Sequence, residues 1–222
     1  MRWGWPFLIY VVVSIVHLVR IALLQPELDL TKLLLMPALL VSVLLVALVT
    51  SRGAVPGRRG WWAVGLLSAG VAASFAGDAL LGPSFEAGLG FFALAHVLYI
   101  ILFNGPAKAN VIRWWTLVYP VLLVVAIVVL WPHLSDGLKP LLVGYGIVLA
   151  LTAMTSSRVG RIAAVGGAFF FVSDLILAFA MFYTPFDGFF QEPWRGLAIM
   201  TTYCLGEGLI AFGVLRRLRA IR

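Results

Sequence analysis

Charged side chains are scarce in this sequence. Asp, Glu, Lys and Arg make up 11% of the 222 residues, whereas hydrophobic residues make up 63% and the mean hydropathy is +1.06. Water-soluble domains are typically about 25% charged and ~45–50% apolar, and a chain of this length cannot enclose so much apolar surface in one core. The scarcity of charge excludes an ordinary soluble domain and indicates an integral membrane protein.

Cysteine and the short catalytic motifs are also rare or missing. The single cysteine, Cys204, lies in an apolar stretch and excludes an intrachain disulfide. The sequence has no HExxH, GxSxG or P-loop motif, and no cluster of His, Cys and Asp has metal-ligand spacing. These absences argue against a zincin, a serine hydrolase and a P-loop ATPase, and we expect no metal or organic cofactor.

Long apolar runs are what the chain has in abundance. They are about twenty residues long and continuous, as in membrane-spanning helices, whereas barrel strands are about ten residues long with alternating polarity. No linker divides the chain, so we expect one integral membrane domain over 1–222. The expected fold is all-α, a polytopic bundle of eight transmembrane helices. The expected spans are 6–24, 31–50, 61–81, 86–103, 113–131, 139–157, 162–183 and 196–215.

The net charge of +7 comes from 16 basic and 9 acidic residues. In a membrane protein such an excess sets loop topology, so we expect no nucleic-acid partner. On one side of the predicted bundle lie 12 of the 16 basic residues, and the loop acids all lie on the other side. The positive-inside rule then places both termini in the cytoplasm, and we expect a multi-pass protein of the bacterial plasma membrane. The basic residues on the inner side are Arg2, Arg52, Arg58, Arg59, Lys108, Arg113, Arg158, Arg161, Arg216, Arg217, Arg219 and Arg222, and the loop acids are Glu27, Asp29, Glu86, Asp136, Asp187 and Glu192.

Three acids and two histidines lie inside the predicted spans: Asp78, Asp174, Glu207, His17 and His96. An ionisable group in lipid costs roughly 2.5–3.5 kcal/mol on insertion scales and by default marks a functional site. The alternative is a protonated acid that joins two helices by hydrogen bonds. Two aspartates in the similar contexts FAGDALL and FVSDLIL, together with a histidine, favour the functional interpretation.

The same acids belong to a weak internal repeat. Lys32 and Lys139 each open an even-numbered span, and Asp78 and Asp174 each lie in the span that follows. Four spans separate the corresponding elements, which indicates a possible parallel four-plus-four repeat. All four residues, by their depth, are expected in the outer half of the membrane.

Further polar side chains share helix faces with these groups. Tyr203 and Glu207 are four residues apart, and His96 and Tyr99 are three apart. Two carboxyl groups in one low-dielectric cavity tend to divide into a protonated and an ionised member. Glycosidases use such a pair on acetal bonds, and a vinyl ether needs the same arrangement.

Several blocks of the sequence occur together in one known family. They are FAGDALLG (75–82), GLGFFALAHVLYIILF (88–103), GGAFFFVSDLILAF (166–179) and TYCLGEGLIAFG (202–213), with weaker matches in TKLLLMP (31–37) and KPLLVGYGIVLALTAM (139–154). In this combination and order the chain resembles the YhhN family of lysoplasmalogenase-like membrane proteins. The resemblance implies an eight-helix hydrolase that cleaves the vinyl-ether bond of lysoplasmalogens. The products would be a fatty aldehyde and glycerophosphoethanolamine or glycerophosphocholine.

The resemblance also implies which polar positions matter, and two positions depart from it. The family's polar positions correspond to Lys32, Asp78, His96, Tyr99, Asp174 and Tyr203. The chain has Glu207 where the family commonly has glutamine, and Leu33 where it often has proline. The first departure would add a third acid to the expected cavity and change its protonation or its choice of substrate.

We therefore assign expected roles to eight residues. The predicted catalytic residues are Asp78, Asp174 and His96, with His96 orienting one aspartate or carrying protons. The predicted substrate-binding residues are Lys32, Tyr99, Lys139, Tyr203 and Glu207. The expected partners are a lysophospholipid substrate and the lipid bilayer, and the oligomeric state is left open.

Two other functions fit the same residues. A small proton-coupled lipid or solute transporter also uses intramembrane acids and histidines, although this chain is short for a carrier. A non-catalytic lipid-binding membrane protein would use the acids only as contacts between helices. Aldehyde release, solute uptake and the effect of Asp-to-Asn changes distinguish the three.

Overall fold

The computed structural model describes residues 4–23, 30–51 and 57–220. Within these ranges the chain forms helices and no strand. The elements in chain order are α1 (Phe7–Ala22), α2 (Leu30–Ser51), α3 (Arg58–Leu80), α4 (Phe85–Asn104), the 3₁₀ turn η2 (Trp114–Leu117), α5 (Val118–Leu130), the 3₁₀ turn η3 (Trp131–His133), α6 (Leu138–Ser156), α7 (Arg161–Phe182), the short α8 (Phe186–Phe189) and α9 (Trp194–Ala220).

Seven helical segments of the described chain are long and apolar enough to cross a membrane. They are α2, α3, α4, the continuous run from η2 to η3, α6, α7 and α9. The first helix, α1, is apolar but has 16 residues in the described part, just under the ~17–25 residues of a typical span. The all-helical, multi-pass prediction is confirmed, whereas the count of eight spans remains a prediction.

Helix ends depart from the predicted spans mainly at the C-terminal side of the chain. The last helix, α9, runs from Trp194 to Ala220 rather than over 196–215, because Arg217 and Arg219 favour a helix C-terminus by compensating its dipole. The predicted loop before α9 contains the short helix α8. Between α3 and α4 the predicted break is confirmed, and the Ser84 hydroxyl caps α4 by accepting from Ala87 N at 3.4 Å.

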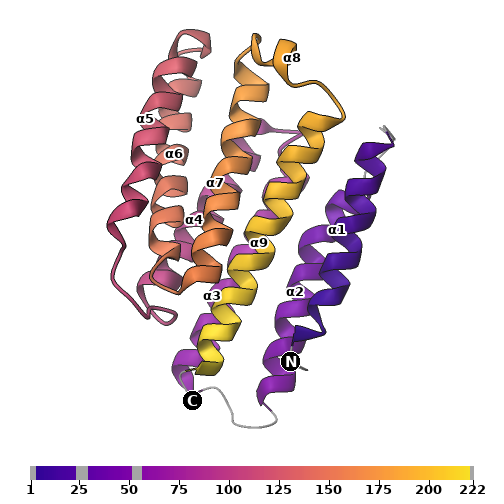
Figure 1. The fold of residues 1–222 in the computed structure, drawn as a ribbon, viewed down its shortest axis with the longest axis vertical. Helices are drawn as coiled ribbons and strands as arrows, with labels where there is room; N and C mark the ends of the chain where they lie inside the picture. Colours follow the sequence, from indigo (N-terminus) through magenta and orange to yellow (C-terminus); the bar gives the residue numbers. More distant parts are fainter. Residues whose placement is uncertain (1–3, 24–29, 52–56, 221–222) are drawn as a thin grey trace.

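The helices pack side by side, with α7 and α9 in the most extensive contact and α3 and α4 next (Figure 1). Glycines let the backbones of α7 and α9 touch. A Cβ atom on Gly206 would lie 2.8 Å from the Phe170 backbone nitrogen, and one on Gly166 would lie 2.7 Å from that of Ile210. Small residues at contacts are the usual means of helix association in membranes. This close pair fixes Asp174 on α7 relative to Tyr203 on α9.

Small residues also precede both intramembrane aspartates. Gly77 lies under the ring of Phe92 on α4, where a Cβ atom would come within 2.8 Å of that ring. The Ser173 hydroxyl donates to the carbonyl of Ile199 on α9 at 3.0 Å. Each aspartate is therefore held close to a neighbouring helix by the residue before it.

Most of the described basic residues lie at one end of the bundle. The helix α1 begins and α9 ends at this same end (Figure 1), where Arg58 and Arg59 open α3, Arg158 follows α6 and Arg161 opens α7. This clustering agrees with the predicted orientation, and the cytoplasmic location of this end stays a prediction. Of the residues used for that prediction, Arg2, Glu27, Asp29, Arg52 and Arg222 lie outside the described residues.

Candidate active site

A cavity lies among the helices at the end of the bundle opposite the basic loops. The space open to water-sized molecules is about 140 Å³, whereas one water needs roughly 10–15 Å³. The walls come from the starts of α2, α4, α6 and α9 and the last halves of α3, α5 and α7. Most of the lining is apolar. The lining residues with a charged or hydroxyl group are Lys32, Asp78, Tyr145, Ser173, Asp174 and Tyr203.

Asp78, in the last turn of α3, has partners on two other helices. Its Oδ2 accepts a hydrogen bond from the Tyr203 hydroxyl of α9 at 2.8 Å. Its Oδ1 lies 3.8 Å from the Lys32 Nζ of α2. Both carboxyl oxygens of Asp78 therefore face donors, one of which carries a positive charge.

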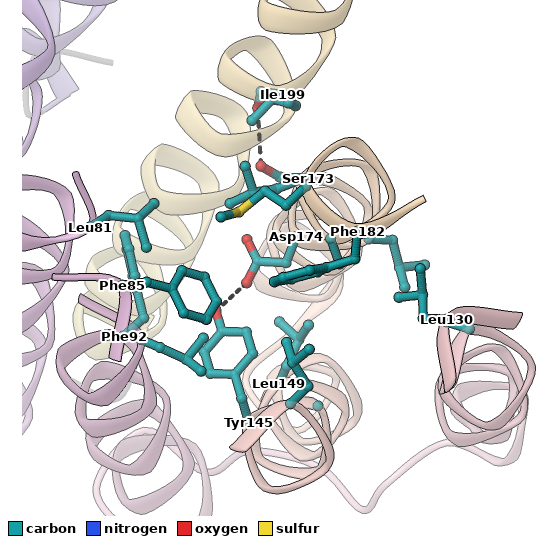
Figure 2. Close-up of a pocket in the computed structure, with 18 of the residues that line it drawn as sticks. Leu81, Phe85, Phe92, Leu130, Tyr145, Leu149, Ser173, Asp174, Phe182 and Ile199 are labelled. Atoms are coloured by element: carbon teal, nitrogen blue, oxygen red, sulfur yellow. Dashed lines mark hydrogen bonds between the residues drawn. The ribbon is translucent and has the colours of Figure 1, made fainter. Parts of the chain in front are cut away.

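Asp174, in the second half of α7, has a different environment. Figure 2 shows its carboxyl group pointing from α7 toward Phe85, with one oxygen joined to the Tyr145 hydroxyl. Tyr145, on α6, donates to Asp174 Oδ2. The His96 Nε2 of α4 lies 3.8 Å from the same oxygen.

His96 is fully buried beside Asp174 and Tyr145. Its Nε2 lies 3.2 Å from the Tyr145 hydroxyl oxygen, and its ring packs edge-on against Phe170 with centroids 4.8 Å apart. No hydrogen-bond partner for the other ring nitrogen, Nδ1, exists among the residues that the structure describes. His96 thus contacts the site through Nε2, behind Tyr145 as seen from the cavity.

The third intramembrane acid, Glu207 on α9, is fully enclosed. Its Oε1 accepts from the Ser74 hydroxyl of α3 and its Oε2 from the Tyr99 hydroxyl of α4, both at 2.6 Å. Neither Glu207 nor Tyr99 is among the residues that line the cavity. Glu207 and Tyr99 therefore contact each other outside the cavity. Their predicted helix-face neighbours, Tyr203 and His96, lie at the two aspartates instead.

Lys139, at the start of α6, points into a loop. Its Nζ lies 2.6 Å from Asp136 Oδ1 and 5.2 Å from the ring centre of Trp131. The hydrogen bond and the charge of Lys139 hold the pKa of the exposed Asp136 below its ordinary value. Lys32 and Lys139, which the sequence aligned as repeat equivalents, thus have different partners, and the repeat itself remains a prediction.

The structure brings part of the predicted site together. Lys32, Asp78, Asp174 and Tyr203 line one cavity. His96 does not line it, but contacts the lining residue Tyr145. The roles predicted for these residues, and for Tyr99, Lys139 and Glu207, remain predictions.

Sequence reasoning missed Tyr145. It lies in the stretch KPLLVGYGIVLALTAM, six residues after Lys139. Its side chain carries a hydroxyl group in an otherwise apolar span. A tyrosine in a span is commonly a packing residue, so only its contact with Asp174 distinguishes it.

The model of the YhhN family matches residues 28–214. The chain belongs to the YhhN family. It is also 32% identical over 160 residues to the protein named lysoplasmalogenase TMEM86B of Homo sapiens.

This alignment covers 68% of the chain and 64% of the human protein, so the chain spans less than two thirds of that relative's length. No solved structure matches the chain.

Proposed function

We propose that this YhhN-family member is a lysoplasmalogenase-like membrane hydrolase that cleaves the vinyl-ether bond of lysoplasmalogens. One observation carries the proposal: two aspartates from different helices, Asp78 and Asp174, line the same mostly apolar cavity. The similarity to a human protein named lysoplasmalogenase supports this substrate class. We further propose that it acts in the bacterial plasma membrane with both termini in the cytoplasm.

The polarity of the cavity suits a single-chain phospholipid. Much of its wall on α5, α6 and α7 is aliphatic, with Leu130, Leu142 and Leu177 among its residues, and this part would accept the alkenyl chain. Each buried methylene contributes about 0.8 kcal/mol to binding. Lys32, 33% exposed and on the other side of Asp78, would attract the phosphate. The vinyl-ether bond would then lie next to the aspartates.

The chemistry needs a proton donor and a proton acceptor. A protonated aspartate gives its proton to the β-carbon of the vinyl ether, which leaves an oxocarbenium ion at the α-carbon. The other aspartate, as a carboxylate, stabilises that cation and takes a proton from the attacking water. In the resulting hemiacetal the first carboxylate removes the hydroxyl proton while the second acid protonates the leaving glycerol oxygen. An aldehyde and the glycerophospho-headgroup leave, and both aspartates return to their starting states.

Mass spectrometry of the products tests the proposal. Purified protein is incubated with a lysoplasmalogen and, as the matched control, with the acyl lysophospholipid of the same chain length. We expect fatty aldehyde and free headgroup from the first substrate and no fatty acid from the second. Absence of aldehyde at any pH would contradict the proposal. Uptake of intact lipid into proteoliposomes without product would instead support the transporter hypothesis.

A further inference from the structure

The two cavity aspartates differ in how many of their oxygens have partners. Asp78 has a donor at each oxygen, Tyr203 at Oδ2 and Lys32 near Oδ1. Asp174 has Tyr145 at Oδ2, with His96 farther off. Among the described residues Asp174 Oδ1 has no hydrogen-bond partner, and the residue lines the cavity.

We propose that Asp174 is the general acid of this cavity, that Asp78 is the carboxylate partner, and that Tyr145, supported by His96, is the residue that positions the proton of Asp174. This assignment rests on the proposed vinyl-ether hydrolysis. It adds to it the identity of the acid and a positioning residue that the sequence did not indicate.

The direction of the hydrogen bonds around Tyr145 supports the assignment. The Tyr145 hydroxyl has one proton and donates it to Asp174 Oδ2. The hydrogen bond of 3.2 Å between His96 Nε2 and the Tyr145 oxygen therefore requires that Nε2 carries a hydrogen and donates it. A hydrogen on Nδ1 would be buried without an acceptor, which is costly. His96 is thus a neutral Nε2–H donor behind Tyr145.

This order of donors determines where an Asp174 proton lies. In a protonated carboxyl group the carbonyl oxygen accepts and the hydroxyl oxygen donates. Because Tyr145 already donates to Oδ2, Oδ2 is the accepting oxygen and the proton lies on Oδ1. Oδ1 is the oxygen with no partner, so it can donate to a substrate carbon in the cavity.

The partners of Asp78 favour its ionised form, in contrast to the protonated form proposed for Asp174. The Lys32 ammonium balances the charge of a carboxylate, and Tyr203 donates to it. Such a group is suited to stabilise the oxocarbenium ion and to accept a proton from water. The charged and titratable groups around the two aspartates are Lys32, His96, Tyr145 and Tyr203, with Glu207 and Tyr99 one layer deeper.

Two tyrosine variants test the assignment through the pH dependence of kcat. A general acid that must be protonated sets the alkaline limb of a bell-shaped profile, and a carboxylate that must be ionised sets the acid limb. We expect Tyr145→Phe to lower kcat about 10- to 100-fold, within the ~10²–10⁴ that acid–base catalysis contributes, and to move only the alkaline limb. KM should stay similar in Tyr145→Phe. Tyr203→Phe should move only the acid limb of the kcat profile.

The matched control is Tyr10→Phe, because Tyr10 is another buried tyrosine whose hydroxyl donates, here to the Cys204 carbonyl at 2.9 Å. It should leave kcat and both limbs at their wild-type values. The exchanged pattern, with Tyr145→Phe moving the acid limb and Tyr203→Phe the alkaline limb, would overturn the assignment. So would a wild-type kcat in Tyr145→Phe.

Two variants of His96 provide a second test of the positioning role, independent of the substitution at Tyr145. His96→Gln retains an N–H donor near Tyr145, whereas His96→Leu removes it. We expect His96→Leu to lose more kcat than His96→Gln at equal Tm, and equal losses would contradict the positioning role. Failure of wild-type protein to release aldehyde would instead refute the proposed function, so the two failures are distinguishable.

Discussion

Asp78 and Asp174 face a cavity, whereas Glu207 is sealed between α3, α4 and α9. All three acids lie in helices that are apolar enough to cross a membrane. Glu207 has one hydroxyl donor for each oxygen and no contact with the cavity space. A buried acid in a membrane helix can act on a ligand or join helices. Only an acid that reaches empty space can touch a ligand, and here that condition is met by Asp78 and Asp174.

The largest expected effect is the loss of turnover when one of the two cavity aspartates is replaced. Asp78→Asn and Asp174→Asn should each lower kcat/KM for a lysoplasmalogen by about 10²–10⁴-fold or more, because each removes one half of the acid–base pair. Their Tm should stay close to that of the wild type, since asparagine has the same shape. Aldehyde release by gas chromatography measures the effect. Wild-type rates in both variants would refute the catalytic pair.

Replacement of the enclosed acid, Glu207, should lower the stability of the protein. Glu207→Ala leaves the hydroxyls of Ser74 and Tyr99 without acceptors, at about 1–3 kcal/mol for each buried group left unpaired. Glu207→Gln, which retains an acceptor, should lose less. Thermal unfolding in detergent measures both. A raised KM with unchanged Tm in Glu207→Gln would instead support the substrate-binding role predicted from the sequence.

Lys32 should have a smaller, substrate-dependent effect. Lys32→Gln removes the cation nearest to Asp78, and we expect KM for a lysoplasmalogen to rise about 10-fold, equivalent to ~1.4 kcal/mol. Lys139→Gln is the comparison variant, because Lys139 contacts Asp136 and Trp131. If Lys139→Gln raised KM more than Lys32→Gln, the phosphate site would belong near α6.

The smallest effect concerns the loop outside the membrane. Lys139 holds the folded-state pKa of Asp136 below the ordinary 3.8, so the ionised form favours the folded state. The stabilisation is present above pH 3.8 and is lost as the pH falls through the lower folded-state pKa. Asp136→Asn should therefore lower Tm slightly at neutral pH and not at strongly acidic pH. A Tm difference that grows toward acid would contradict this sign.

Much of the fold was predictable because lipid allows few solutions. A backbone in the bilayer must satisfy its own hydrogen bonds, so each apolar run of sufficient length predicts a helix. The break between the spans 61–81 and 86–103 was predicted on the same grounds. The short helix α8 was not, because it lies in a loop where no periodic signal distinguishes one turn of helix from a turn.

The partners of the acids were less predictable than their presence. Ionisable residues are rare in spans, so Asp78, Asp174 and Glu207 attract attention from composition alone. The sequence does not show which face of each helix points into the bundle. In a membrane both the lipid-facing and the interior faces are apolar, so amphipathic periodicity is weak. Tyr145 was therefore not recognised from the sequence, and Glu207 was grouped with the aspartates.

The amino-acid sequence is enough to predict a helical membrane protein, the end at which its basic residues lie, and three acids that are costly in lipid. The folded arrangement is needed to show that Asp78 contacts Lys32 and Tyr203, that Asp174 contacts Tyr145, and that Glu207 is enclosed. Helix formation and helix length depend on local composition. The pairing of side chains depends instead on the rotation and separation of helices far apart in the chain, such as α7 against α9, whose glycines set how closely they approach.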